Sequence, residues 1–169
     1  MHAALYESDS RILAAFSIAI DGLEREFGGV MPEDAVSPDS LSALAEAAIA
    51  IRPMAHAPYS NFFVGAAVLD EKGEIHTGVN VENAAYPNGI CAETAAIAAM
   101  VASGARRIRA IAVVGGGEGL CTPCGGCRQR IREFSIAETP IAIAGPGGIR
   151  KLLTLGELLP ESFGPENLS

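Results

Sequence analysis

Residues 108–114 read Ile-Arg-Ala-Ile-Ala-Val-Val, an almost unbroken apolar run. Such a run is typical of a strand that is covered on both faces. Before it, the sequence predicts a helix that starts near Cys91 and ends at Gly104. After it, a short helix is predicted from the 124–127 segment, followed by a strand at 141–144. Strands that alternate with helices favour a layered α/β domain.

Further elements are predicted toward both ends of the chain. In chain order they are an amphipathic helix over 9–27, a linker over 30–37, a helix that Ser37 and Pro38 begin and that runs to about Met54, a strand over 62–69, a turn at 71–74, a second strand over 75–81, and a last helical turn over 152–159. We expect residues 1–37 to form an N-terminal extension of unknown role and residues 38–169 to form the domain itself.

Composition narrows the class of protein. The chain has 169 residues, enough for one domain, and 49% of them are apolar. The net charge of −8 argues against nucleic-acid binding, which needs clustered Lys and Arg. No apolar stretch is long enough to span a membrane, and the start lacks the features of a secretory signal. We therefore expect a cytoplasmic protein whose four cysteines stay reduced, and two disulfides are the weaker alternative.

Cysteines and one glutamate gather in two short segments, Cys91-Ala92-Glu93 and Pro123-Cys124-Gly125-Gly126-Cys127. Three thiolates leave a fourth, open position on a tetrahedral zinc ion, which suits a catalytic site. Such a zinc ion makes hydroxide available near neutral pH. Glu93, two residues after a ligand, is placed to move protons, although a glutamate in a first helical turn can also simply favour the helix dipole.

A fourth cysteine, Cys121, lies three residues before Cys124. It leaves two alternatives open, a dithiol redox motif and a structural zinc site made of four sulfurs. A four-sulfur site would have no open position and would leave the Cys91-Ala92-Glu93 segment unexplained. We therefore expect Cys121 to take no part in metal binding.

The chain resembles the short, homotetrameric cytidine deaminases over about residues 38 to 168. Five motifs match in order: 58–67 (Pro-Tyr-Ser-Asn-Phe-Phe-Val-Gly-Ala-Ala), 80–86 (Asn-Val-Glu-Asn-Ala-Ala-Tyr), 91–93 (Cys-Ala-Glu), 123–129 (Pro-Cys-Gly-Gly-Cys-Arg-Gln) and 158–163 (Leu-Leu-Pro-Glu-Ser-Phe). The resemblance implies a three-layer α/β/α sandwich around a mixed five-stranded sheet. It also implies one zinc ion per chain, bound where two helix N-termini meet.

The resemblance implies roles for individual residues. Cys91, Cys124 and Cys127 match the zinc ligands, and Glu93 matches the proton shuttle. Residues that match substrate-binding positions are Phe62 beside the base, Asn80 and Glu82 at the ribose hydroxyls, Ala92 in the zinc segment, and Tyr86 and Phe163, which reach into the site of a neighbouring subunit. The partners so implied are a pyrimidine nucleoside and further copies of the chain.

The expected reaction is hydrolytic deamination of cytidine and 2′-deoxycytidine, a step of pyrimidine salvage. One alternative is a deaminase of another aminated pyrimidine nucleoside, such as a blasticidin-like antibiotic, and the ribose pair Asn80 and Glu82 speaks against it. A nucleotide or RNA substrate fits worse, because Glu82 would repel a 5′-phosphate and no basic surface is visible. A module in which zinc only stabilises the fold is the non-enzymatic alternative.

Two features depart from the family pattern. Many short members carry arginine directly after the catalytic glutamate, where it offsets the charge of three thiolates, and here that residue is Thr94. Helix dipoles and Arg128 are then the candidates to offset that charge. The second departure is the extension over residues 1–37, which the family pattern does not cover.

Overall fold

A mixed sheet of five strands organises the described residues, 36–168, of this computed structural model. Its strands are β1 (Gly65–Asp70), β2 (Ile75–Val79), β3 (Ile108–Val114), β4 (Pro140–Gly145) and β5 (Gly148–Thr154), in the spatial order β2-β1-β3-β4-β5. Only the β3–β4 pair is parallel, and the other three pairs are antiparallel. The strand predicted over 108–114 is therefore the central one, and its residues are buried apart from the half-buried Arg109.

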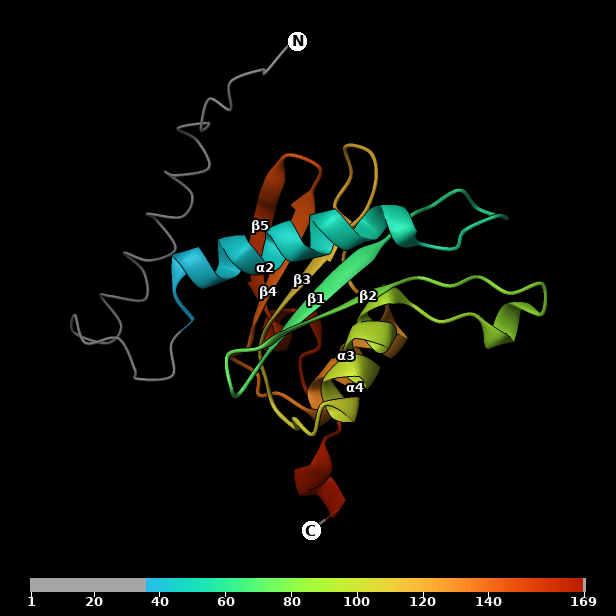
Figure 1. Ribbon diagram of the computed structural model, residues 1–169. Helices are drawn as coiled ribbons and strands as arrows, with labels where there is room; N and C mark the ends of the chain where they lie inside the picture. Colours follow the sequence, from blue (N-terminus) through green and yellow to red (C-terminus); the bar gives the residue numbers. More distant parts are fainter. Residues whose placement is uncertain (1–35, 169) are drawn as a thin grey trace.

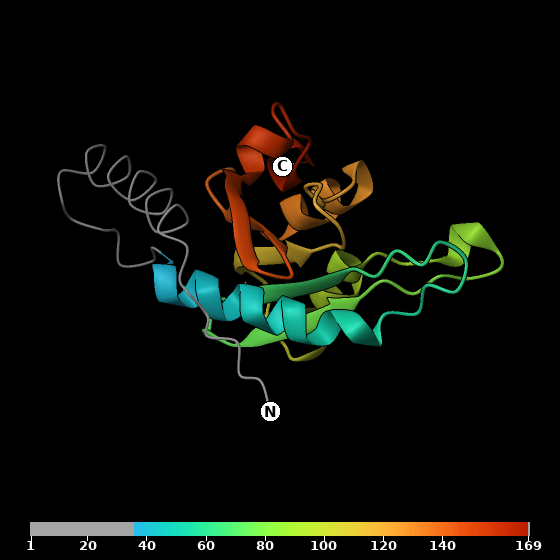
Figure 2. The same ribbon diagram turned by 90° about the horizontal axis from the view of Figure 1, so that it is seen from above.

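Helices cover both faces of the sheet (Figures 1 and 2). Helix α2 (Pro38–Ile51) packs on one face, where Leu41, Leu44 and Ala48 join the alanines of β3 in one apolar cluster. Helices α3 (Ala92–Ala102) and α4 (Gly125–Glu133) lie on the other face. Side chains of α3 and α4 form a second apolar cluster with Val68 and Ile111. The predicted three-layer α/β/α sandwich is confirmed.

The helix predicted from Ser37 begins as expected. The Ser37 side chain accepts a hydrogen bond from the amide of Ser40 at 3.2 Å, and proline follows at the first helical position. The α-helix ends at Ile51 and tightens into one 3₁₀ turn, η1 (Arg52–Met54). The predicted end near Met54 is therefore correct, with a change of helix type in the last turn.

Helix α3 lies close against the edge strand β2. A Cβ atom added at Gly78 of β2 would lie 2.3 Å from the backbone nitrogen of Ala96. Only glycine leaves room for this approach. The contact fixes where the first turn of α3 sits relative to the end of β2, and both segments contribute residues to the site described below.

The prediction of a helical turn over 152–159 was wrong in its first part. Residues up to Thr154 belong to β5, which pairs with β4 after a turn in which Gly148 adopts φ = 112°. Exposed Arg150 and Lys151 break the apolar pattern, as is common in an edge strand, so the strand was not recognised. The helical turn is α5 (Leu155–Leu158), and a capping box formed by Thr154 and Glu157 starts it.

Two boundaries also differ from the predictions. Strand β1 begins at Gly65 rather than Phe62, and β2 ends at Val79 rather than Val81. The side chain of Asn80 explains the first difference, because its Oδ1 accepts a hydrogen bond from the Val64 amide, which a sheet neighbour would otherwise engage. Residues 62–64, just before β1, are thereby held in an irregular conformation.

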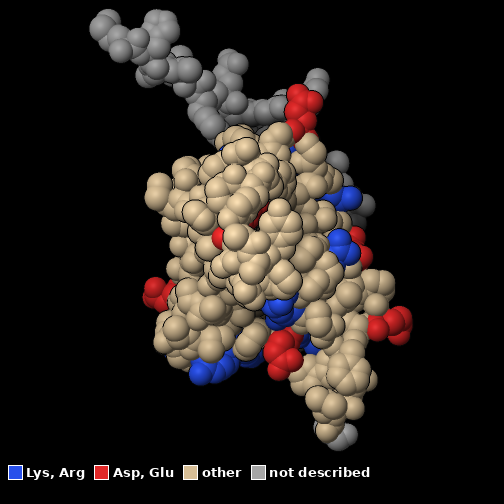
Figure 3. Space-filling model, turned by 90° about the vertical axis from the view of Figure 1, so that its right-hand side faces the viewer, with Lys and Arg blue, Asp and Glu red and all other residues tan. Residues whose placement is uncertain are grey.

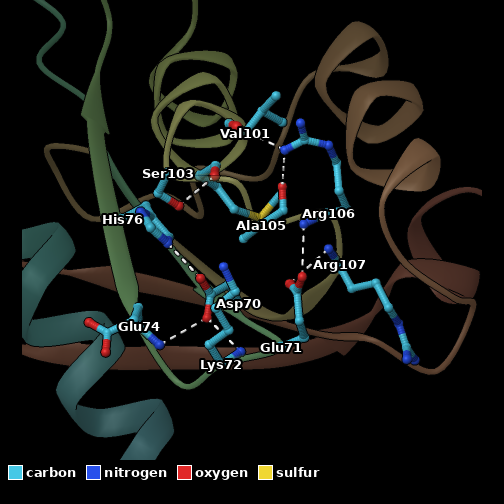
Figure 4. A network of polar contacts seen from close by, with 11 residues as sticks. Asp70, Glu71, Lys72, Glu74, His76, Val101, Ser103, Ala105, Arg106 and Arg107 are labelled. Atoms are coloured by element: carbon cyan, nitrogen blue, oxygen red, sulfur yellow. Dashed lines mark hydrogen bonds and ion pairs between the residues drawn. The ribbon is translucent and has the colours of Figure 1, made fainter.

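A polar corner ties the β1–β2 turn to the segment after α3 (Figure 4). Buried Asp70 accepts hydrogen bonds from His76 Nε2 at 2.8 Å and from the amides of Lys72 and Glu74. The Glu71 carboxylate accepts from the amides of Arg106 and Arg107, each at 3.0 Å. The segment with Arg106 and Arg107 therefore forms a corner between helix α3 and strand β3.

The helix predicted over 9–27 and the linker up to residue 35 lie outside the described residues. In the part of the chain that the structure describes, no helix combines the length and apolar character needed to cross a membrane.

Candidate metal centre and active site

Two helices begin at cysteines. Cys91 is the N-cap of α3 and Cys124 is the N-cap of α4, and neither sulfur caps its own helix through a hydrogen bond. Their backbone carbonyls instead start the helices, accepting from Ala95 at 3.1 Å and from Arg128 at 2.9 Å. The predicted meeting of two helix N-termini is confirmed, and both sulfurs are left available to a ligand.

Three sulfur atoms converge between these helices. The Sγ atoms of Cys91, Cys124 and Cys127 all lie within 4.8 Å of one another, and those of Cys91 and Cys124 are 3.9 Å apart. Tetrahedral zinc with Zn–S bonds of about 2.3 Å places two sulfurs roughly 3.8 Å apart, so the spacing fits zinc. Cys127 is buried, Cys91 is half-buried and Cys124 is exposed, which leaves one side of the cluster open.

The pKa values of these thiols reflect their burial and their closeness to one another. Burial raises the pKa of the Cys127 thiol, and the charge of Glu93 raises it further. Burial likewise raises the pKa of Cys91. Burial acts in the same direction on Cys124, but hydrogen bonds from the Cys127 amide and the neighbouring thiols outweigh it and lower its pKa. Three thiolates this close together need a bound cation, and zinc is the usual ion for such a donor set.

All four cysteines are free, so the disulfide alternative fails. Cys121 lies outside the three-sulfur group and packs instead against the apolar cluster between the sheet and α3. Burial raises the pKa of its thiol. A four-sulfur structural site is therefore not what this structure forms.

Glu93 lies in the first turn of α3 with 4% of its surface exposed. Burial raises the pKa of its carboxyl group, and the charge of Arg130 opposes that effect only in part. Glu93 and Cys91 both line a cavity of about 610 Å³, a size typical of sites for small molecules. A buried carboxyl group beside the sulfurs can exchange protons with a molecule bound there.

The same cavity brings together most of the predicted substrate-binding residues. Those that line it are Phe62, Asn80, Glu82, Tyr86 and Ala92. Figure 3 shows a hollow surrounded mainly by uncharged residues, with an acidic residue recessed inside it. Phe163 does not line the cavity; it is exposed near the C-terminus, and its carbonyl accepts a hydrogen bond from Gln129.

Asn80 and Glu82 differ in their surroundings. Both ends of the Asn80 amide bind backbone, because Oδ1 accepts from Val64 and Nδ2 donates to the Phe62 carbonyl at 2.9 Å. The Glu82 carboxylate accepts from the Ser60 hydroxyl and from the Tyr59 and Ser60 amides. These bonds, the Ser60 hydroxyl first, lower the pKa of Glu82. Glu82 thus presents an ionised carboxylate, and Asn80 holds the backbone beside it in place.

Sequence reasoning missed several residues of the site. Ser60 and Tyr59 orient Glu82, and the Tyr59 ring meets Tyr86 edge to face at 6.0 Å. Both lie in the matched 58–67 segment, which was the available signal. Cys121 and Thr122 also line the cavity.

The guanidinium of Arg128 binds backbone carbonyls. Its Nε donates to the Pro123 carbonyl and its Nη1 donates to the Leu158 carbonyl, both at 2.8 Å. Arg128 therefore braces the loop that carries Cys124 against α5, and its expected part in offsetting the thiolate charge stays a prediction.

Comparisons with known proteins agree with this geometry. Residues 38–143 match the family model described as cytidine and deoxycytidylate deaminase zinc-binding region. The chain is 44% identical over 118 residues to the cytidine deaminase of Sporosarcina psychrophila, covering 70% of this chain and 87% of that protein. The cytidine deaminase of Mycobacterium tuberculosis is 42% identical over 114 residues, covering 68% of this chain and 82% of that protein.

The fold is also similar to solved structures of cytidine deaminases. The crystal structure of a cytidine deaminase from Burkholderia pseudomallei superimposes with a TM-score of 0.69 at 41% identity, covering 76% of this chain and all of that one. The structure of the enzyme from Mycobacterium tuberculosis gives a TM-score of 0.64 at 39% identity, covering 72% and 95%.

Proposed function

The chain belongs to the cytidine and deoxycytidylate deaminase family, and we propose that it deaminates cytidine and 2′-deoxycytidine with Glu93 as the proton carrier. The enzyme is a zinc-dependent cytidine deaminase, and Cys91, Cys124 and Cys127 form its zinc-binding triad. The reaction consumes water and releases ammonia, so that the amino group of the base is replaced by oxygen.

Glu93 performs the proton transfers of this proposal. The metal, when bound, supplies hydroxide near neutral pH by lowering the pKa of water to about 7. The Glu93 carboxylate takes a proton from the attacking water and gives it to ring nitrogen N3, then takes the proton of the hydroxyl group newly bonded to C4 and gives it to the amino group, which leaves as ammonia. The single observation that carries this role is its burial on the cavity wall, two residues after Cys91.

The loop residues hold the nucleoside. The Glu82 carboxylate accepts a hydrogen bond from the ribose 3′-hydroxyl, and Asn80 keeps the adjoining backbone in place. Phe62 packs beside the base, and Ala92 lines the cavity below it. Because nothing in these roles uses the 2′-hydroxyl, the site accepts both ribose and deoxyribose.

The working form of the enzyme in this proposal is a homotetramer with shared sites. Support comes from two exposed aromatic residues, Tyr86 in the cavity lining, which is 76% exposed, and Phe163 near the C-terminus, which is 57% exposed. The segment between β2 and α3 extends away from the sheet beside the connection from α2 to β1, without a helix packed over it (Figures 1 and 2). Exposed aromatic side chains of this kind are typical of subunit interfaces. Free thiols at the metal site fit the reducing cytoplasm.

Ultraviolet absorbance of the two nucleosides, incubated with the zinc-loaded protein, tests the substrates. A change to the uracil spectrum with one ammonia released per nucleoside supports the proposal for that nucleoside. An unchanged spectrum with zinc bound at one per chain would overturn it and point to a modified pyrimidine.

A further inference from the structure

A threonine touches the most deeply buried sulfur of the metal centre. Thr94 Oγ1 lies 3.9 Å from Cys127 Sγ, and this contact links the first turn of α3 to the first turn of α4. Cys127 has no exposed surface, so water cannot take the place of the hydroxyl. This contact lies outside every role assigned above.

The direction of the hydrogen bond follows from the chemistry of a metal ligand. A cysteine that binds zinc does so as a thiolate, which has lone pairs but no proton to donate. The threonine hydroxyl carries the only proton in the pair and is therefore the donor. A hydrogen bond to an ionised acceptor is stronger than one between neutral groups.

We propose that Thr94 is a positioning residue for the metal centre, whose hydroxyl donates a hydrogen bond to the Cys127 thiolate and thereby strengthens zinc binding. The inference rests on the proposed function in one respect, namely that Cys127 is a zinc ligand. It explains how a site with three thiolates works with an uncharged residue directly after Glu93.

Two arginines near the sulfurs do not stabilise the Cys127 thiolate directly, and we therefore assign that role to Thr94. Arg128 follows the ligand Cys127 directly, but its guanidinium donates to the Pro123 and Leu158 carbonyls. Arg130 is exposed on α4, where solvent weakens its charge, and the effect of that charge falls on the pKa of the Glu93 carboxyl group. A hydroxyl hydrogen bond stabilises the negative charge of one sulfur and also fixes its direction. Groups that hydrogen-bond to metal ligands act in this way on affinity and geometry.

Replacement of Thr94 by valine tests the proposal, because valine has nearly the same shape and lacks the hydroxyl. Zinc affinity is measured by competition with a chelator on the full-length protein, without nucleoside. The expected result for Thr94→Val is a loss of affinity of about tenfold or more, the usual effect of removing such a partner. Thr94→Ser keeps the hydroxyl and should stay within about threefold of the original protein.

Cobalt provides a second readout. Cobalt(II) bound to thiolates absorbs light through sulfur-to-metal charge transfer, which responds to a hydrogen bond on the sulfur. We expect the band to shift in Thr94→Val and to keep its position in Thr94→Ser. Thr77→Val, the same change on β2 and outside the cavity lining, is the matched control and should leave affinity and spectrum unchanged.

Two outcomes would overturn the inference: equal zinc affinity in Thr94→Val and the original protein, or an equal loss in Thr94→Ser. Thermal unfolding of the metal-free variants separates misfolding from weaker binding, and Thr94→Ala serves in place of Thr94→Val if the latter does not fold. Because the readouts involve no turnover, a protein that binds zinc but deaminates neither nucleoside would refute the proposed function and leave this inference standing.

Discussion

Ser60 holds the carboxylate of Glu82 with both its side chain and its main chain. Its hydroxyl donates to Oε1, and its amide donates to Oε2 at 3.2 Å. The same hydroxyl accepts a hydrogen bond from the Phe62 amide at 3.0 Å. One serine thus connects the residue proposed to bind the ribose with the residue proposed to pack beside the base.

Replacing Ser60 by alanine should therefore weaken nucleoside binding more than it slows chemistry. The Glu82 carboxylate keeps two amide donors but loses its hydroxyl donor, so its orientation toward the ribose is less firmly fixed. We expect KM for cytidine to rise about tenfold while kcat changes less than about twofold, in steady-state kinetics. Ser103→Ala, which removes a hydroxyl bonded to Met100 at the far end of α3, should change neither constant. An unchanged KM in Ser60→Ala would remove Ser60 from the site.

Glu93→Gln keeps the shape of the side chain and removes its capacity to carry a proton. Because positioned acid–base groups contribute between about 10² and 10⁴ in rate, we expect kcat to fall about 10³-fold. The three sulfurs are untouched, so zinc should remain bound at one per chain, as measured by atomic absorption. Glu74→Gln, in the exposed β1–β2 turn, is the control. Turnover at the original rate in Glu93→Gln would refute the proton-carrier role.

Much of the fold was predictable because its elements have clear local patterns. The apolar run over 108–114 predicts a central strand, and the serine–proline pair at 37–38 predicts the start of α2. Strand β5 was missed because Arg150 and Lys151 interrupt its apolar pattern, and pairing with β4 decides its conformation. The sequence of a single strand does not by itself reveal that it pairs with another strand.

The residues of the site likewise include some that a local motif predicts and some that depend on contacts between distant segments. The triad and Glu93 could be predicted because each lies within a short motif at a helix start. The contact between Thr94 and Cys127 could not, since it depends on how two helices that start 33 residues apart are placed. For the same reason the sequence did not reveal the hydrogen bond from Arg128 to the Leu158 carbonyl, which lies 30 residues further along the chain.

The hydrogen bonds that the buried Asp70 carboxylate accepts make stability depend on pH. Burial alone would raise the pKa of Asp70, but the hydrogen bonds from His76 and from the amides of Glu74 and Lys72 lower it below its ordinary value of 3.8. A lowered pKa means that the folded state favours the ionised carboxylate. Its contribution is therefore complete well above pH 3.8 and is lost as the pH falls through the lowered value.

Asp70→Asn should accordingly destabilise the protein at neutral pH by about 2 kcal/mol, the contribution of hydrogen bonds to a charged group. The measurement is urea unfolding of the metal-free protein between pH 7 and pH 3, which avoids acid release of zinc. We expect the difference between the two proteins to shrink as the pH falls below 3.8. A difference that stays constant over this range would show that the ionisation of Asp70 does not contribute.

Shared active sites would make two inactive variants complement each other. In the proposed tetramer Phe163 completes the site of a neighbouring subunit, so Phe163→Ala should lower kcat/KM by about 30-fold, as expected for an aromatic contact worth 2 kcal/mol. Its zinc triad remains intact, because Phe163 does not line the cavity of its own chain. Light scattering after size exclusion should still report a tetramer, since other contacts hold the subunits together.

Co-expression of Glu93→Gln with Phe163→Ala then distinguishes sharing from a local effect. In a mixed tetramer, a subunit with intact Glu93 can receive Phe163 from a subunit that carries Glu93→Gln, and that site has every group it needs. We expect activity at least about fivefold above the mean of the two separately expressed variants, because closed symmetry brings unlike subunits together at shared sites. Subunits mixed after purification, without exchange, are the control. If co-expression gives only the mean of the two activities, each chain works alone, and the roles proposed for Tyr86 and Phe163 across the interface are wrong.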